Sequence, residues 1–398
     1  MISVEEARKR ILASLRSTAA ETVSVAQAWG RVLARDVEAR LDQPPEDVSA
    51  MDGYALRAAD SGPWAVIGSA PAGHPFDGRV GENQAVRLFT GSYVPAGADA
   101  IALQEDADRD LDQLTLRETP TVGRHIRQRG GDFERGQTLL SSGTRLGARA
   151  VGLAAAANHP WVSVHRRPRI AILATGDEIA LPGDELRPGG IVSSNAHALA
   201  AMITASGGEP IVLPIAPDTI DAVAAAADSV SGIDLLVTTG GASVGEHDLI
   251  QRGLGERGFT LDFWQIAMRP GKPLIFGRLG DTPVLGLPGN PVSAFVCGIL
   301  FLVPAIAVLA GQREWRLPIA SALLAEPVPA NDHRADHLRA TLSAEPSGTL
   351  HVRPFPKQDS SHLRRLADAQ ALIVRPPNAP AASEGATVEI IRLDLGLL

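Results

Sequence analysis

The chain has 398 residues, of which 45% are apolar and 21% are charged, and its formal net charge is -8. That length is too great for one ordinary hydrophobic core, so we expect two to four domains of roughly 100 to 200 residues each. The composition excludes a disordered chain, and the acidic balance argues against a broad nucleic-acid or acidic-membrane surface, because both partners need a cationic field.

The single cysteine and the apolar segments bear on where the protein works. Cys297 has no second cysteine to pair with, so an intrachain disulfide is impossible and the cytoplasm, a reducing compartment, is expected.

The N-terminal residues place their apolar groups at helical spacing among charges, unlike a signal-peptide core. Residues 294–310 are uncharged and close to the shortest membrane span, about 17 residues. Pro304 within them and the missing basic anchor before them favour a buried helix in a soluble chain.

The predicted type of secondary structure changes along the chain. Residues 1 to about 40 are expected to be helical with a loose end. Short apolar runs broken by Gly and Pro at 42–143 predict a small, mostly β domain, and a helix is predicted at 148–157. Strand-like and helical runs then alternate, which predicts a parallel sheet with helices on both faces. The predicted strands are 170–175, 209–216, 234–239, 273–279 and 283–287, and the predicted helices are 195–207, 219–230, 248–258 and 294–310. From 312 onward, short alternating runs predict a closing β domain of about 80 residues.

Three loops that leave predicted strands share a chemical theme. They deliver Thr175 to Glu178, Thr238 to Asp248, and Pro288 to Ser293. Because the carboxyl ends of parallel strands meet at one edge of a sheet, the three loops should open on one rim. Glycines in such turns let backbone N–H groups approach an anion, and a helix N-terminus adds about half a positive charge. A phosphate or a carboxylate is therefore the expected ligand.

The glycine loop is not a nucleotide P-loop. Gly240 to Gly245 has the G-x-x-x-x-G spacing, but Glu246 follows where that motif needs lysine. Acids beside a phosphate raise the free energy of the anionic ligand unless a cation lies between them, so Glu178 and Asp248 suggest a hard divalent ion such as Mg2+. Taken singly, each of these acids is better explained as a helix cap than as a metal ligand. Taken together on one rim, metal binding is favoured.

Other polar segments also have both a functional and a plain structural interpretation. Arg269 and Lys272 flank a Pro-Gly turn in "MRPGKP" and can supply point charges for phosphate, although an exposed turn lysine is usually only solvated. His333 and His337 have i,i+4 spacing, but a solvated polar stretch is favoured over a metal site. The stretch around Asp52, "PPEDVSAMDGYAL", reads equally well as a hairpin corner. Protease, hydrolase and dinucleotide-binding motifs are missing from the sequence.

Eight segments in family order carry a resemblance to a known family. They are "PPEDVSAMDGYA", "TGSYVPAGADAIALQED", "HIRQRGGDFERG", "RPRIAILATGDEI", "SSNAHAL", "TTGGASVGEHDL", "MRPGKP" and "GLPGNPVSA". On these motifs the sequence closely resembles the molybdopterin molybdenumtransferases of the MoeA type, which are related to the C-terminal domain of gephyrin. The resemblance covers essentially the whole chain.

The resemblance implies an elongated subunit with four domains. These are a helical linking domain made of 1–45 and 144–166, an inserted β-rich domain at 46–143, a molybdopterin-binding three-layer α/β domain at 167–315, and a C-terminal β domain at 316–398. It also implies a homodimer whose active site lies between the α/β domain of one subunit and the first domains of the other.

By the same resemblance, the reaction is insertion of molybdenum from molybdate into adenylylated molybdopterin, with Mg2+ and with release of AMP. Transient contact with the adenylylating enzyme is implied as well. Catalytic roles are implied for Asp52, Glu178, Asp218, Asp248 and Lys272, with Glu178 and Asp248 as metal ligands. The loops and the resemblance together give this substrate-binding set: Thr90, Arg127, Asp132, Thr175, Gly240, Gly241, Ser243, Arg269, Pro288, Asn290, Pro291 and Ser360.

Two positions depart from the family's pattern, and two alternative functions stay open. Gly131 stands where an acid is usual, and Asp359 replaces a glycine; both change the charge expected around the pocket. A gephyrin-like scaffold would keep the fold and bind a partner peptide, but it has no need for the charged set. A molybdopterin adenylyltransferase would resemble residues 167–315, but it lacks the long N-terminal region.

Overall fold

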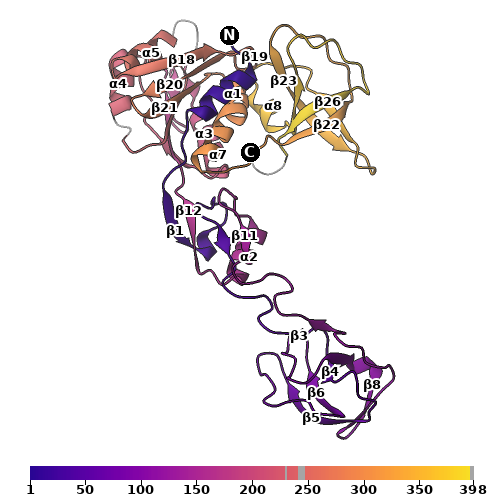
Figure 1. Cartoon of the computed structure of the whole chain (residues 1–398). Helices are drawn as coiled ribbons and strands as arrows, with labels where there is room; N and C mark the ends of the chain where they lie inside the picture. Colours follow the sequence, from indigo (N-terminus) through magenta and orange to yellow (C-terminus); the bar gives the residue numbers. More distant parts are fainter. Residues whose placement is uncertain (229–230, 241–246, 395–398) are drawn as a thin grey trace.

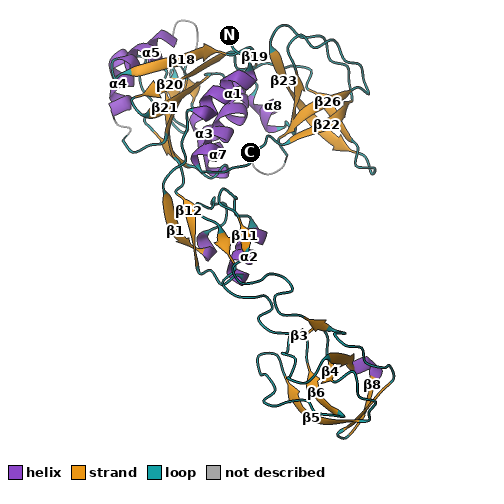
Figure 2. Cartoon of the chain, in the orientation of Figure 1, coloured by secondary structure: helices purple, strands orange, loops and turns teal. Residues whose placement is uncertain are grey.

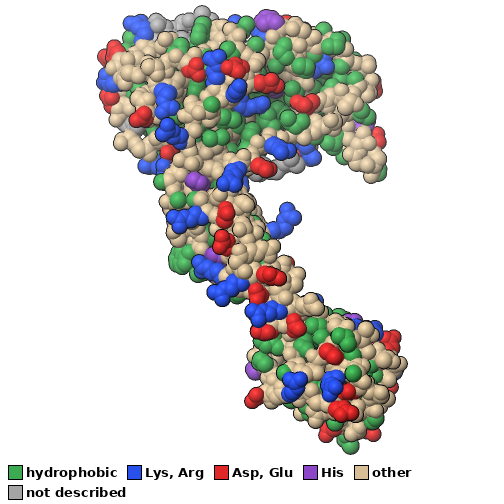
Figure 3. All heavy atoms as spheres, in the orientation of Figure 1, with side chains coloured by type: hydrophobic (Ala, Val, Ile, Leu, Met, Phe, Trp, Pro, Cys, Tyr) green, Lys and Arg blue, Asp and Glu red, His purple; other side chains and the backbone are tan. Residues whose placement is uncertain are grey.

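The computed structural model describes residues 1–228, 231–240 and 247–394. The chain is elongated (Figure 1), with an α/β part and a C-terminal β part side by side at one end and a separate β-rich part at the other. Two strands and their surroundings connect the ends. On the face shown in Figure 3, acidic and basic side chains are interspersed along the whole length.

A six-stranded sheet forms the centre of the α/β part. Its order is β16 (Glu209–Val212), β13 (Arg169–Ala174), β17 (Leu235–Thr239), β21 (Thr282–Leu287), β20 (Pro273–Leu279) and β18 (Phe259–Gln265). The first four strands are parallel, as predicted. The strand β20 runs opposite to them, and β18, which is antiparallel to β20, runs in their direction again. The short turn between β20 and β21 forces the direction of β20, because parallel neighbours need a long crossover. The strand β18 was not predicted.

Helices cover both faces of this sheet, which gives the expected three layers (Figure 2). Side chains alternate along the strands, so Ile170 and Ile172 face one core while Ala171 and Leu173 face the other. The first core lies under α3 (Asn195–Ala205), α6 (Pro291–Cys297), the π-helical turn η3 (Gly298–Leu302) and α7 (Val303–Leu309). The second lies under α4 (Ile220–Asp228) and α5 (His247–Gly255).

The apolar helix at Pro291–Leu309 is part of the core. By length and composition it passes as a candidate membrane span, and 83% of its most apolar window is buried inside the protein. The N-terminal helix α1 (Val4–Ala13) packs against this segment through Ala7 and Ile11. We expected residues 1–45 to belong to a linking domain, but this first helix contributes to the core of the α/β part.

The connection between the two ends is mixed rather than helical. Strand β1 (Ala20–Ser24) pairs with β12 (Trp161–His165), and β2 (Val37–Glu38) pairs with β11 (Thr138–Leu140). The turn η1 (Val25–Gln27) and the helix α2 (Ala148–Ala156) pack on them over a small core that includes Leu33, Leu146 and Val164. The expectation of helix over residues 1 to about 40 is therefore wrong beyond residue 13. The run "AETVS" is extended because it pairs with a strand far along the chain.

The β-rich end is a six-stranded sheet with small elements around it, and its core includes Leu56, Trp64 and Leu114. The sheet consists, in order, of β7 (Ala100–Leu103), β4 (Gly53–Leu56), β6 (Gln84–Leu88), β5 (Trp64–Ala70), β9 (Gln113–Leu116) and β8 (Ala107–Asp110). The turn η2 (Gln104–Asp106) and a pair formed by β3 (Val48–Ser49) and β10 (Ile126–Arg127) complete it.

The C-terminal part is a closed β structure, because β23 (Ala335–Ala344), near one edge of the sheet, also pairs with β25 (Ala371–Arg375) at the other edge. Its strands are β22 (Ile319–Leu324), β23 (Ala335–Ala344), β24 (Leu350–Pro354), β25 (Ala371–Arg375) and β26 (Thr387–Arg392), joined by β19 (Met268–Arg269) from the α/β part. The short helix α8 (Leu363–Ala367) lies against α6. The C-terminal β domain was expected from the sequence.

Candidate functional site

The three chemistry-bearing loops begin at the same edge of the sheet, as expected. Ala174 is in register with Thr239, and Thr239 is in register with Leu287. The loops that follow β13, β17 and β21 therefore start side by side. This edge is the carboxyl end of the parallel strands, where ligands of such sheets bind.

The loops pack backbone against backbone at two glycines. Gly240 has a φ of +95°, and a Cβ on it would lie 2.4 Å from the carbonyl oxygen of Thr175. A Cβ on Gly289 would lie 3.4 Å from the Cα of Gly240. The hydroxyl of Thr175 is buried here and has no hydrogen-bond partner among the described residues. Only glycine fits at position 240, and the close approach leaves backbone groups and one free hydroxyl at the rim.

A side chain that the sequence did not single out connects two of these loops. The amide of Asn195, at the start of α3, donates one hydrogen bond to the Thr239 hydroxyl at 2.9 Å and another to the Gly289 carbonyl at 2.7 Å. Both partners are distant in sequence. The only sequence signal was the segment "SSNAHAL", which was noted for resemblance and not for chemistry.

Carboxylates gather beside the first loop. Asp177 and Asp218 are tied together, because the Asp177 N–H donates to the Asp218 carboxylate at 3.4 Å and the Asp218 N–H donates to the Asp177 carboxylate at 3.1 Å. Glu178 is exposed on the same loop. A cavity of about 570 Å³ opens next to them, between this loop and the segment that carries β14 (Ile179–Ala180) and β15 (Ile191–Val192).

Some predicted residues of the second loop cannot be placed. Gly241 and Ser243 lie outside the described residues, and so does the side chain of Asp248, whose backbone belongs to the first turn of α5. Within the described part of the chain, no three His, Cys, Asp or Glu side chains are grouped so as to hold a metal ion. The prediction of Glu178 and Asp248 as metal ligands thus stays a prediction.

Lys272 reaches the same edge of the sheet from another direction. Strand β20 runs antiparallel to β21, with Ile275 opposite Gly286, so the beginning of β20 lies beside the end of β21. Lys272 precedes β20 and is exposed, and no carboxylate among the described residues forms an ion pair with it. Its catalytic role stays a prediction. Arg269 differs, because its guanidinium pairs with Asp332 at 2.9 Å and with Asp336 at 3.2 Å.

The third loop leads into α6 and meets the C-terminal part of the chain. Pro288 is buried, Asn290 precedes the helix, and Pro291 is its first residue, a position that suits the fixed φ of proline. The carbonyl of Ser360 accepts a hydrogen bond from the Val292 N–H at 3.1 Å. The predicted residue Ser360 is thus held close to the rim.

The departure at Asp359 has a local structural explanation. One oxygen of its carboxylate accepts hydrogen bonds from the Ser361 N–H at 2.9 Å and from the Ser361 hydroxyl at 2.7 Å. These bonds hold the pKa of Asp359 below its ordinary value, with the backbone bond as the larger cause. Asp359 therefore orders the turn that presents Ser360.

A second group of predicted residues lies in the β-rich part. One oxygen of Asp52 accepts hydrogen bonds from the Thr90 N–H and from the Thr90 hydroxyl, both at 2.8 Å. These two bonds, with the nearby Arg87 guanidinium as a smaller cause, lower the pKa of Asp52 from its ordinary value. Asp52 is therefore held as a carboxylate acceptor. It is not the corner of a hairpin, because β3 and β4 on either side of it pair with other strands.

Arg127 and Asp132 belong to the same part of the chain. They line a cavity of about 600 Å³ together with Pro44, Gly91 and Tyr93. Gly91 follows Thr90 directly, so this cavity adjoins the Asp52–Thr90 pair. The structure thus brings together four of the predicted site residues.

The two groups are not brought together within one chain. The β-rich part that carries Asp52 lies at the far end from the sheet edge that carries Lys272 and Gly240 (Figure 1). The connecting strands β1 and β12 lie between them. A site that uses both groups needs a second copy of the chain.

The expectation for His333 and His337 is wrong for the second residue. His337 belongs to the strand β23 and is 4% exposed, so the stretch is not solvated. His333 lies in a bend before this strand, so the i,i+4 spacing does not place the two imidazoles one turn apart as it would on a helix. Burial lowers the pKa of His337 to about 4.

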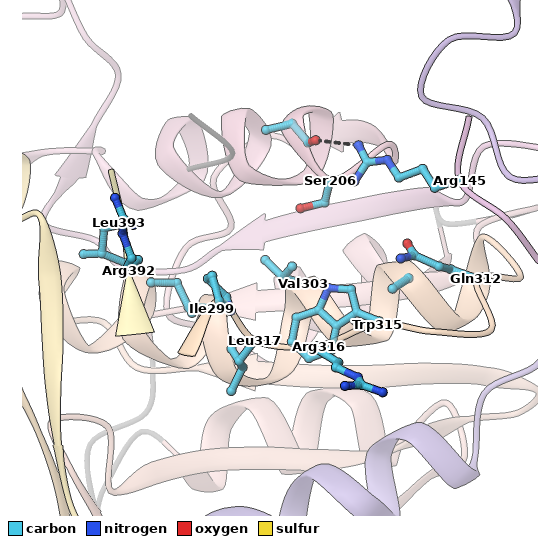
Figure 4. A pocket seen from close by; sticks show the side chains of 13 residues that line it. Arg145, Ser206, Ile299, Val303, Gln312, Trp315, Arg316, Leu317, Arg392 and Leu393 are labelled. Carbon is cyan, nitrogen blue, oxygen red and sulfur yellow. Dashed lines mark hydrogen bonds between the residues drawn. The ribbon is translucent and has the colours of Figure 1, made fainter. Parts of the chain in front are cut away.

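A further cavity, of about 100 Å³, lies away from all of these residues. It is formed by the end of α3, by α7 and by the segment that follows it, and Trp315 and Arg145 point toward it (Figure 4). The end of α3 leads into β16, so this cavity is at the opposite edge of the sheet from the three loops. None of the predicted site residues lines it.

Comparisons with known proteins agree with this architecture. Three family models match the chain in order: "MoeA N-terminal region (domain I and II)" at residues 2–158, "Probable molybdopterin binding domain" at 171–308, and "MoeA C-terminal region (domain IV)" at 321–393. The crystal structure of a molybdopterin biosynthesis MoeA protein from Pyrococcus horikoshii superposes with a TM-score of 0.84 at 31% identity, over 98% of this chain and 99% of that one.

Two curated relatives match over nearly their full length. The molybdopterin molybdenumtransferase of a Nostoc species is 34% identical over 94% of this chain and 89% of the relative. Molybdopterin molybdenumtransferase 2 of Mycobacterium tuberculosis is 33% identical over 98% and 99%. Fold and site thus define a multidomain protein built on an α/β domain of the molybdopterin-binding class. The chain belongs to the molybdopterin molybdenumtransferase family, the MoeA family.

Proposed function

We propose that this protein inserts molybdenum from molybdate into adenylylated molybdopterin and releases AMP. The proposal rests on one observation above all: the three loops start, and the exposed Lys272 lies, at one edge of the sheet, in a chain whose nearly full-length relatives carry the name molybdopterin molybdenumtransferase. The activity would place the protein in molybdenum cofactor biosynthesis in the cytoplasm.

The chemistry of the rim suits these substrates. Adenylylated molybdopterin carries a pyrophosphate, and molybdate is an oxyanion, so both need donors and cations. Backbone N–H groups around Gly240 and Gly289 can approach a phosphate closely, because neither residue has a side chain to block it. Lys272 would act as a compact positive charge for the same anion. The buried Thr175 hydroxyl offers one more partner.

A magnesium ion fits the donor set of the first loop. Glu178, Asp177 and Asp218 offer carboxylate oxygens, which Mg2+ prefers, and they stand beside the 570 Å³ cavity. We propose Glu178 and Asp248 as the ligands. Mg2+ is usually held by one or two carboxylates and by substrate phosphates. Once bound, the ion would neutralise charge on the pyrophosphate.

We further propose that the protein works as a homodimer with a composite site. Asp52, Thr90, Arg127 and Asp132 of one subunit would face the sheet edge of the other. The elongated shape supports this arrangement, because one chain keeps the two groups at opposite ends. Transient contact with the enzyme that adenylylates molybdopterin belongs to the same proposal, since that enzyme makes the substrate.

Release of AMP tests the proposed function and its need for metal. Purified protein incubated with adenylylated molybdopterin, molybdate and Mg2+ is expected to release AMP and to form active cofactor. Chelation by EDTA should stop AMP release, and added Mg2+ should restore it, because the pyrophosphate is otherwise uncompensated beside the acids. AMP is quantified by chromatography. Turnover no faster than in a protein-free control would refute the proposed function.

A further inference from the structure

We infer that Asn195 is a positioning residue for the substrate cradle: its side-chain amide joins the end of β17 to the loop after β21 and holds Gly289 beside Gly240. The inference rests on the proposed function for the identity of the ligand. It names a residue outside the predicted set of catalytic, substrate-binding and metal-binding side chains.

The direction of the Asn195 amide is settled by its partners. The Gly289 carbonyl can only accept a hydrogen bond, so the atom 2.7 Å from it must be the amide nitrogen. The second N–H of the same nitrogen points to the Thr239 hydroxyl at 2.9 Å. That hydroxyl in turn donates to the Pro288 carbonyl at 3.4 Å. Both N–H groups of the amide are therefore used: one holds the backbone of the loop after β21, and the other holds the end of β17.

The position of this bridge explains why it would matter for binding. Thr239 is 2% exposed and is the last residue of β17, so it is fixed by the sheet. Gly289 is exposed and belongs to no strand or helix. The bridge thus ties a turn that lies outside the sheet and the helices to the end of a buried strand, at the point where Gly289 approaches Gly240. Loss of the bridge would let the Gly289 turn leave its place beside Gly240.

Helix stability alone does not explain Asn195. It is the first residue of α3, and its side chain forms no bond with the backbone N–H groups of its own helix among the described residues. Aspartate would suit this position in the helix at least as well, because acidic side chains are favourable in the first turn. Asparagine is needed for the bridge instead, because a carboxylate cannot donate to the Gly289 carbonyl.

Calorimetric titration of adenylylated molybdopterin into the protein, without molybdate, separates positioning from folding. Asn195→Asp keeps the shape of the side chain, so the variant should still unfold cooperatively, at a temperature well above that of the titration, although the lost hydrogen bonds lower its stability somewhat. Its Kd should rise about tenfold or more, with the binding stoichiometry unchanged, as expected when hydrogen bonds worth a factor of ten are lost. Thr239→Val removes the other partner without adding charge, and its Kd should rise about threefold to tenfold.

His197→Asp is the matched control. His197 is exposed in the first turn of the same helix, so the change adds the same charge without touching the bridge, and its Kd should stay within about twofold of wild type. Kd values of Asn195→Asp and Thr239→Val within that range would overturn the inference, and so would a lowered stoichiometry at unchanged Kd. Wild-type protein that binds the ligand but releases no AMP would refute the proposed function alone. Wild-type protein that does not bind it would refute both.

Discussion

Replacement of Lys272 by methionine is expected to lower kcat/KM for adenylylated molybdopterin by about 10²- to 10³-fold, the usual cost of removing one electrostatic donor from an active site. Lys272 is exposed beside the end of β21 and has no ion-pair partner among the described residues. Its charge is therefore available to the ligand. Methionine keeps the length of the side chain and removes only the ammonium group.

Two further lysine variants make this result specific. Lys272→Arg should recover part of the activity, because the guanidinium keeps the charge but spreads it over a planar fork. Lys9→Met removes an exposed lysine from α1 and should leave kcat/KM within about twofold, the size expected of a surface change away from the site. Steady-state AMP release measures all three. If the kcat/KM of Lys272→Met equals that of Lys9→Met, Lys272 does not take part in the site.

Replacement of Gly240 by valine should damage both stability and activity. Its φ of +95° strains any residue with a Cβ, and that atom would lie 2.4 Å from the Thr175 carbonyl oxygen. We expect the free energy of unfolding to fall by about 2–4 kcal/mol. The loop must also move, and a displacement of about 1 Å can cost a hundredfold in rate. Urea unfolding and AMP release at saturating substrate report the two effects.

Gly255→Ala provides the comparison for this change. Gly255 is the last residue of α5, and a Cβ on it would have open space around it. Alanine should therefore leave unfolding unchanged or slightly stabilise the helix. Normal unfolding and activity in Gly240→Val would mean that the strand-end loops are not packed as described.

The sheet could be predicted because its strands carry continuous apolar runs. The segments at β13, β17 and β21 are buried on both faces, and this produces a pattern that needs no knowledge of the partner strand. Strand β18 has no such run. Its sequence, "FTLDFWQ", alternates in burial, which is a strand signal of its own, but it directly follows a helical pattern and was not predicted. The linking region was misjudged because β1 acquires its structure only by pairing with β12, far along the chain.

The candidate site could be predicted in part for a similar reason. Glycines and acids at the ends of apolar runs mark Thr175, Glu178 and Gly240 without any structure. Asn195 has no such mark, because its role depends on partners 44 and 94 residues away. Local sequence patterns also cannot predict the separation of Asp52 from the sheet edge, because it follows from the elongated arrangement of the whole chain.

A hybrid dimer tests the central claim, that the site is shared between two copies of the chain. One copy carries Asp52→Ala and the other Lys272→Met, each with its own affinity tag, so that only hybrids survive two purification steps. In a two-fold dimer with shared sites, one site of the hybrid combines both changes and the other has neither, so AMP release should reach about half of the wild-type rate. A hybrid as inactive as the two parent dimers would contradict the claim, because each site would then lie within a single chain.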